Sequence, residues 1–215
     1  MLQAFEKFST NIQQIKALSD VYTHLVSQAA FAQNESIVAD ILRAQWVYAV
    51  SALDKFIHDV VRIGMIRAFT GQGQRSAKFL SFEIPLSVLL EMAPSESSNA
   101  VIDESERLTA FTKRVNDKLK HLSFQDASKI ADGLSYIWEE NYKWQKITQQ
   151  INTDTGSSQT DTNIKSELTR IVNRRNQIVH EADLSLATGE KNEISTEDIS
   201  IVVDFIEHLV KAIYH

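Results

Sequence analysis

Apolar residues recur at helical spacing along most of the chain. From Leu2 to about Gln33 large apolar side chains stand three or four residues apart, a pattern that predicts one amphipathic helix. The next stretch, from about Glu35 to Phe69, has apolar side chains at too many positions for a surface helix. It predicts a long, central helix that is the most buried element of the fold.

The pattern then predicts shorter helices with polar connections between them. They are expected from Pro85 to Pro94, from about Ala100 to His121, from the N-cap Asp126 through Ile137, and onward through WEENYKW to near Ile151. Connecting segments are expected near residues 70–82, 93–99, 152–160 and 183–195, and NTDTGSSQT at 152–160 is interpreted as a loop or a disordered tether.

Two further helices complete the predicted layout. One begins near Asp161 or Thr162 and ends soon after His180, with an apolar face for the core. The last runs from Ile199 to Tyr214. The preceding Ser195–Asp198, STED, predicts a capped start, in which Ser195 or Thr196 accepts hydrogen bonds from free backbone amides and Asp198 favours the positive helix end.

Composition supports an all-α helical bundle that forms a single domain over residues 1–215. Only 6 Gly and 2 Pro are present among 215 residues, which removes most of the material of hairpins and tight turns. The chain has no Cys, so thiolate metal sites and disulfides are excluded, as fits a reducing compartment. We see no secretory signal and no apolar run long enough to cross a bilayer, so a soluble, cytoplasmic protein without membrane contact is expected.

Charge limits how the chain can meet a nucleic acid. The formal net charge of −6 argues against a protein that coats nucleic acid, because such binding scales with the number of phosphates that Lys and Arg neutralise. Any RNA contact must therefore be local. Lys165, Arg170, Arg174 and Arg175 cluster in one segment, and Arg170 and Arg174 are candidate contacts to the RNA backbone.

The most informative motif is RNQIVH, from Arg175 to His180, at the end of a predicted helix. It places a guanidinium, the amide of Asn176 and an imidazole close together. An imidazole moves protons near neutral pH, and an arginine neutralises the charge that builds on phosphorus, so these groups suit RNA cleavage without a metal ion. His180 is the candidate for proton transfer, Arg175 for phosphorane stabilisation and Asn176 for positioning the phosphate or the imidazole.

Helical geometry decides which side chains of this motif can lie on the same face of the helix. Residues four apart, such as Asn176 and His180, share a face, whereas Arg175 and His180 are about 140° apart around an ideal helix. Cleavage by the RNA's own 2′ hydroxyl needs both a base and an acid, and one histidine is short of that requirement. A two-fold dimer would supply two imidazoles in one cleft, so a homodimer is expected.

The helical context, the SALDKFIHDVV segment at 51–61 and the RNQIVHEAD segment at 175–183 resemble the HEPN superfamily, in particular prokaryotic HEPN proteins of the RidA-associated RiboL-PSP-HEPN kind. The resemblance covers most of the chain and implies a helical bundle. It also implies a metal-independent endoribonuclease that uses an Arg-x4-6-His motif paired across a homodimer and needs no cofactor. RNA as substrate, a role in defence or toxin–antitoxin biology, and an antitoxin or defence-system partner protein follow from the same resemblance.

Several alternatives stay open at this stage. Arg174 also fits the family spacing to His180, so the sequence leaves the choice between the two arginines undecided. Asp54 and His58, four apart on the long helix, are a possible pair supporting the active histidine or a possible pair of metal ligands, although a simple contact on the helix flank is the more common arrangement. A non-catalytic HEPN module that binds RNA, nucleotide or a partner protein, and a purely structural helical adaptor, remain the competing interpretations.

Overall fold

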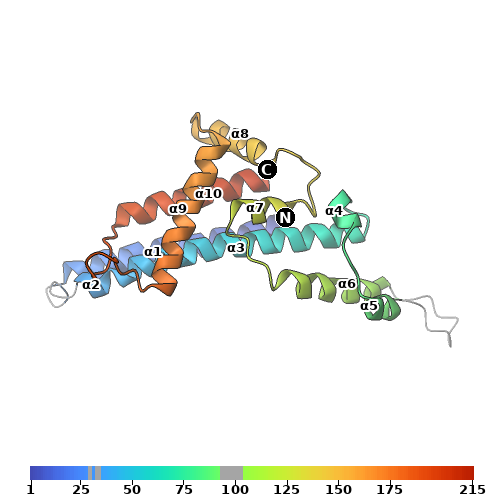
Figure 1. The fold of residues 1–215 in the computed structure, drawn as a ribbon, viewed down its shortest axis with the longest axis horizontal. Coiled ribbons are helices and arrows are strands. Elements are labelled where there is room, and N and C mark those ends of the chain that lie inside the picture. Colours follow the sequence, from blue (N-terminus) through green and yellow to red (C-terminus); the bar gives the residue numbers. More distant parts are fainter. Residues whose placement is uncertain (29–30, 32–34, 93–103) are drawn as a thin grey trace.

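One long helix organises the molecule. In the computed structural model, which describes residues 1–28, 31, 35–92 and 104–215, α3 spans Asp40–Phe69 and runs along most of the elongated shape (Figure 1). Its buried residues lie on several sides of the helix and include Leu42, Trp46, Leu53 and Phe56. The prediction of a central, buried helix is confirmed.

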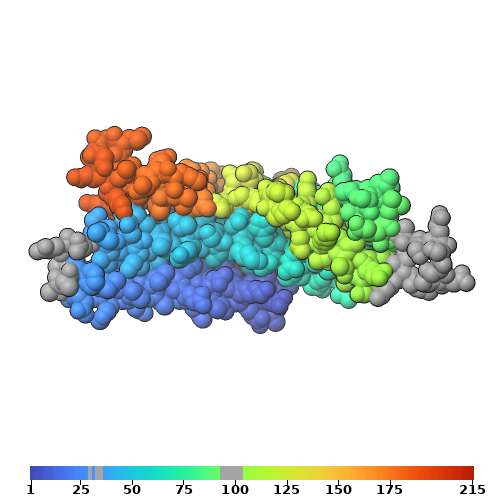
Figure 2. Space-filling view, turned by 90° about the horizontal axis from the view of Figure 1, so that it is seen from below, coloured from blue at the N-terminus to red at the C-terminus, as the bar shows by residue number. Residues whose placement is uncertain are grey.

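The other helices pack around α3. Helix α1 lies beside its N-terminal half, α6 beside its C-terminal half, and α9 crosses it near its start (Figure 1). A view of one face shows α3 between α1 on one side and α9 with α7 on the other (Figure 2). The remaining bounds are α1 Leu2–Ser27, α2 Glu35–Val38, α4 Ala77–Leu80, α5 Leu86–Glu91, α6 Glu104–Leu119, α7 Ala127–Leu134, α8 Lys143–Thr155, α9 Asp161–His180 and α10 Thr196–Tyr214.

The all-α prediction is confirmed. Within the described residues no strand forms, and the single β-type pairing is an isolated bridge between Leu184 and Lys191. Buried apolar residues from α1, α3, α6, α7, α8, α9 and α10 form one connected core. The hydrophobic effect, acting on these amphipathic faces, is the main source of stability.

Helix starts follow the sequence well. Asp126 caps α7 by accepting hydrogen bonds from the backbone amides of Ser128 and Lys129, as predicted. Ser195 and Asp198 form a reciprocal capping box at the start of α10, because each side chain accepts a hydrogen bond from the other's backbone amide. That helix therefore begins at Thr196, three residues earlier than predicted.

Several predicted boundaries are wrong. The first helix ends at Ser27, where Gln28 adopts an extended backbone, and the expected end near Gln33 lies outside the described residues. The central helix is preceded by the separate short α2. A short helix, α4, forms inside the loop expected at 70–82, because Ser76 caps it through the amide of Phe79. The expected ends at Pro94 and Ala100 lie outside the described residues.

The polar segment at 152–160 is the largest local correction. It was expected to be a loop or tether, but α8 continues to Thr155 and the turn that follows is ordered by hydrogen bonds. The Asn152 side chain donates to the carbonyl oxygen of Gln159 at 2.9 Å and accepts from Ser157 at 2.7 Å. Gly156 closes the helix with a φ of 67°, a left-handed conformation that glycine adopts easily. The segment thus holds the start of α9 close to the end of α8.

Candidate functional site

Helix α9 is fixed against the core before it presents its polar residues. Thr160 caps it by accepting from the amide of Asn163. Its apolar stripe of Ile164, Leu168 and Ile171 is buried. Trp46 of α3 donates its ring N–H to the carbonyl oxygen of Ile171 at 2.9 Å, which ties the middle of α9 to the central helix.

A buried carboxylate fixes the C-terminal end of α9. Asp183 is fully buried and contacts two guanidiniums, from Arg43 of α3 at 2.7 Å and from Arg174 of α9 at 2.9 Å. Asn192 donates to its backbone and side-chain oxygens. Ala182 and Asp183 both have positive φ, 51° and 61°, a conformation disfavoured for residues with a Cβ. The charge network therefore stabilises a strained turn directly after the motif helix.

Arg174 is consequently committed to this network. Both of its terminal nitrogens bond to Asp183, and one also donates to the carbonyl oxygen of Glu193. Arg170, the other residue expected to contact RNA, is held by Glu167 through two hydrogen bonds of 2.9 and 2.6 Å. This bonding to Glu167 raises the pKa of Arg170.

Arg170 and Arg174 line a polar cleft of about 640 Å³ beside Trp46. The Arg170 guanidinium lies over the indole ring, 5.7 Å from its centre. The acidic side chains of Glu193 and Asp198 line the same cleft, and they offset the two arginine charges. The cleft therefore lacks the excess positive charge that favours phosphate binding.

Arg175 has different surroundings from its neighbours. Its guanidinium donates to the side-chain oxygen of Asn176 at 3.0 Å. Its Nε is buried and has no hydrogen-bond partner among the described residues, and none of their carboxylates forms an ion pair with it. By contrast, Lys165, Arg170 and Arg174 of the same helix each pair with an acidic side chain. Arg175 is thus the cation of α9 that is left without an anionic partner in the described chain.

His180 is the last residue of α9 and is exposed. Within the part of the chain that the structure describes, its ring makes no ion pair or side-chain hydrogen bond. The backbone after it turns sharply, because the amides of Glu181 and Asp183 both bond to the carbonyl oxygen of Gln177. Arg175, Asn176 and His180 therefore stand on the last turns of one well-anchored helix, with the imidazole at its open end.

Asp54 and His58 have other partners. Asp54 lies 3.7 Å from the His58 ring and accepts a hydrogen bond from the backbone amide of Phe124. The His58 ring also packs edge-on against Phe124. Among the described contacts, none joins this pair to the RNQIVH side chains. The geometry gives the pair a packing role between α3 and the segment before α7.

Asp183 was not among the residues that the sequence suggested. Its position three residues after His180 was only a weak signal of a role beside the motif, because acidic residues in a turn usually face solvent.

The described residues contain no group of three or more His, Asp or Glu side chains placed to hold a metal ion.

The comparison with known families agrees with the helical bundle. The RiboL-PSP-HEPN family model matches residues 9–215, which is almost the whole chain. The chain belongs to the RiboL-PSP-HEPN family. It therefore carries a HEPN-type domain, and this family points to a nuclease or another RNA-related module. No curated protein and no solved structure matches the chain.

The family assignment covers the motif helix as well as the core helices, since the match extends through α9 and α10. Of the described helices of this RiboL-PSP-HEPN protein, none combines the length and the apolar character that a membrane span requires.

Proposed function

We propose that this protein is an endoribonuclease that needs no metal ion and cleaves RNA at a site formed across a homodimer. The observation that carries the proposal is the state of Arg175. It is an α9 guanidinium without a carboxylate partner among the described residues, and it lies next to Asn176 on the helix that ends with His180. An uncommitted guanidinium is available to a phosphate, whereas those of Arg170 and Arg174 are already paired.

The proposed reaction is an intramolecular transphosphorylation. A base removes the proton of the 2′ hydroxyl, the 2′ oxygen attacks phosphorus, and the bond to the 5′ oxygen breaks as an acid gives that oxygen a proton. The products are a 2′,3′-cyclic phosphate and a free 5′ hydroxyl. His180 transfers protons, Arg175 stabilises the charge on the pentavalent phosphorus, and Asn176 orients the Arg175 guanidinium.

A second subunit supplies the second imidazole in this scheme. Base and acid act on opposite sides of the phosphorus, so two copies of His180 from a two-fold pair satisfy the requirement. Exposed apolar side chains close to His180 in sequence support a contact there: Val179, Leu184 and Leu186 are 46%, 44% and 102% exposed. Burial of such side chains against a second copy would favour dimerisation.

A cleavage assay tests the proposal. RNA oligonucleotides of mixed sequence are incubated with the protein in EDTA, and the ends of the products are identified by mass spectrometry. Cyclic phosphate ends are expected. His180→Ala should lower the rate by about 100-fold or more, and Arg175→Ala by roughly 100- to 1000-fold, because each removes a group that acts only during the reaction.

Matched controls separate chemistry from folding. His121 and Arg67 are exposed and distant from α9 in sequence, so His121→Ala and Arg67→Ala should keep the rate within about twofold. Cleavage that requires added Mg²⁺ would contradict the mechanism. RNA binding without cleavage, equal in wild type and His180→Ala, would instead establish a non-catalytic binding module.

We further propose that this activity serves defence or a toxin–antitoxin pair, in which a partner protein restrains the nuclease. A nuclease that needs no metal ion cannot be controlled through the supply of metal, so a partner that blocks its site is an effective restraint. Expression in a host cell offers the test: growth arrest on expression of wild type, and none on expression of His180→Ala, supports this role.

A further inference from the structure

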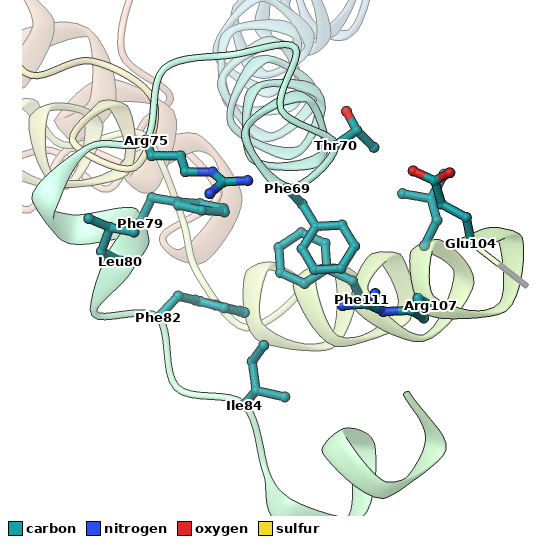
Figure 3. A pocket seen from close by; sticks show the side chains of 11 residues that line it. Phe69, Thr70, Arg75, Phe79, Leu80, Phe82, Ile84, Glu104, Arg107 and Phe111 are labelled. Atoms are coloured by element: carbon teal, nitrogen blue, oxygen red, sulfur yellow. The ribbon is translucent and has the colours of Figure 1, made fainter. Parts of the chain in front are cut away.

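A second site lies at the opposite end of α3 from the motif. It is a pocket of about 390 Å³ formed by the end of α3, by α4 and its flanking segments, and by α6 (Figure 3). Phe69 closes α3 there, whereas Arg43, which contacts Asp183, lies 26 residues earlier. At 1.5 Å per residue these positions are roughly 40 Å apart, so this pocket is separate from the proposed nuclease site.

Phenyl rings form the floor and walls of the pocket. Phe111 of α6 stacks on Phe69, with ring centres 4.1 Å apart. Phe79 and Phe82 approach Phe111 edge-on, at 6.2 and 6.1 Å. Figure 3 shows Phe79, Phe82 and Ile84 reaching from the α4 side toward α6. A flat apolar ligand would meet ring faces and edges on more than one side.

Hydrogen bonds hold these walls in place. Ser76, at the start of α4, donates to carbonyl oxygens of Ser135 and Tyr136 and is buried. Arg114 of α6 donates twice to the carbonyl oxygen of Glu83, next to Phe82. The α4 segment is thus bonded to the residues just after α7 on one side and to α6 on the other. A pocket with fixed walls binds a ligand at a lower entropic cost.

Among the described residues that line this pocket, the charged groups are two guanidiniums and one carboxylate. Arg75 donates from Nε to the carbonyl oxygen of Ala68, which directs its side chain along the pocket wall. Arg107 and Glu104 come from the first turns of α6. The balance is one net positive charge beside an aromatic surface. This balance favours an anionic ligand and opposes an alkylammonium ligand, for which an aromatic pocket without guanidiniums would be suited.

We propose that this pocket binds a small planar aromatic anion. Its volume lies within the range of roughly 300 to 1000 Å³ that is typical of small-molecule sites. The aromatic ring of the ligand packs against the partly exposed rings of Phe79 and Phe82, above the buried Phe111, and its anionic group pairs with Arg75 and Arg107. Two sources share this chemistry, an aromatic carboxylate and a nucleoside monophosphate. The proposal does not depend on whether the protein cuts RNA.

Calorimetric titration of the full chain tests this site. The probes are indole-3-acetate and adenosine 5′-monophosphate, each compared with its uncharged counterpart, indole or adenosine. We expect at least one anion to bind with a Kd below about 1 mM and its uncharged counterpart to bind about tenfold more weakly. Which anion binds identifies the source, and either result supports the proposal.

Paired variants locate the binding. Arg107→Gln should raise the Kd of the anion by about tenfold. Lys113 is exposed on the same helix and does not line the pocket, so Lys113→Gln should leave the Kd of the anion unchanged. Leu108→Trp should fill the pocket and abolish binding, and circular dichroism verifies that this variant is folded. The proposal fails if neither anion binds, if the uncharged compounds bind equally well, or if Arg107→Gln and Lys113→Gln behave alike.

Discussion

Adjacent arginines on α9 illustrate how a single residue acquires its role. Arg174 and Arg175 carry the same group, yet Arg174 is neutralised by Asp183 and Arg175 is bonded to the neutral amide of Asn176. The difference arises because helical geometry turns the two side chains about 100° apart. Arg174 faces the strained turn, whereas Arg175 stands four residues after the buried Ile171, on another face of the helix. In the proposed nuclease, Arg175 is therefore the arginine assigned to the phosphate, while Arg174 holds the turn after the helix.

Replacement of Asp183 should destabilise the whole protein. In Asp183→Asn the guanidiniums of Arg43 and Arg174, whose side chains are 7% and 18% exposed, lose the buried carboxylate that they share, and Arg43 keeps only the more exposed Asp40 as an acidic partner. Loss of one partner in such a buried pair costs roughly 3 to 5 kcal/mol. Urea denaturation measures the change in the free energy of unfolding.

Glu167→Gln is the matched control, because it neutralises a carboxylate that also binds an arginine, Arg170, but at an exposed position. Its effect should stay below about 1 kcal/mol. Equal losses for Asp183→Asn and Glu167→Gln would show that the buried network contributes no more than a surface ion pair.

At the residue scale, the sequence predicts where Arg175 stands on its helix but not the role of Asp183. Arg175 stands four residues after the buried Ile171, so its place on the apolar stripe could be predicted from spacing alone. The role of Asp183 could not, because its partner Arg43 is 140 residues away and only the tertiary fold brings the two together. The same limit applies to Asp54, whose bond to the amide of Phe124 spans 70 residues.

Among the elements, helix starts are the best predicted features, because capping depends on residues within three positions of each other. The N-cap Asp126 and the capping box of Ser195 and Asp198 were both visible in the sequence. Helix ends were harder. At 152–160 a polar composition suggested a loop, whereas Asn152 supplies side-chain hydrogen bonds that order the turn. Composition does not reveal such pairings.

The Asp126 cap predicts a pH dependence of stability. Hydrogen bonds from the side chain and the amide of Ser128 lower the pKa of Asp126 in the folded protein. A lowered folded-state pKa stabilises the fold above the unfolded value of about 3.9, and this contribution is lost as the pH falls through the folded value. Asp126→Asn retains a capping oxygen that does not titrate. Between pH 6 and pH 3 the variant should therefore lose less stability than wild type in chemical denaturation.

Thr160→Asn provides the control for this measurement, since it changes the N-cap of α9 without removing a charge. Its stability should follow the pH dependence of wild type. If Asp126→Asn also follows wild type between pH 6 and pH 3, the cap does not contribute through its charge.

For the whole molecule, the elongated shape places the proposed nuclease site and the aromatic pocket at opposite ends of α3 (Figure 1). The proposed nuclease site also extends beyond one chain. A single copy offers one His180 at an exposed helix end, so the proposal requires cooperation between two copies.

Mixing subunits tests this cooperation. Wild type is combined with a ninefold excess of His180→Ala and allowed to exchange subunits. If one active site requires both histidines, only wild-type pairs cleave RNA, and activity per wild-type chain should fall to about a tenth, because partners are drawn at random. Arg67→Ala in the same excess is the control. Because this variant should cleave RNA itself, the activity per total chain should stay within about twofold of that of wild type alone. Unchanged activity with the His180→Ala excess would mean that each chain acts alone.

The turn between α9 and α10 provides a position at which the proposed dimer can be labelled and measured. A hydrogen bond from the Asn192 side chain to the carbonyl oxygen of Asp183 joins the two sides of its base, whereas Leu186 at its tip is fully exposed. The natural chain lacks cysteine, so Ala187→Cys would create a unique thiol there. A spin label attached to that thiol would report the separation between the two tips by electron paramagnetic resonance, and with it the approach of the two helix ends.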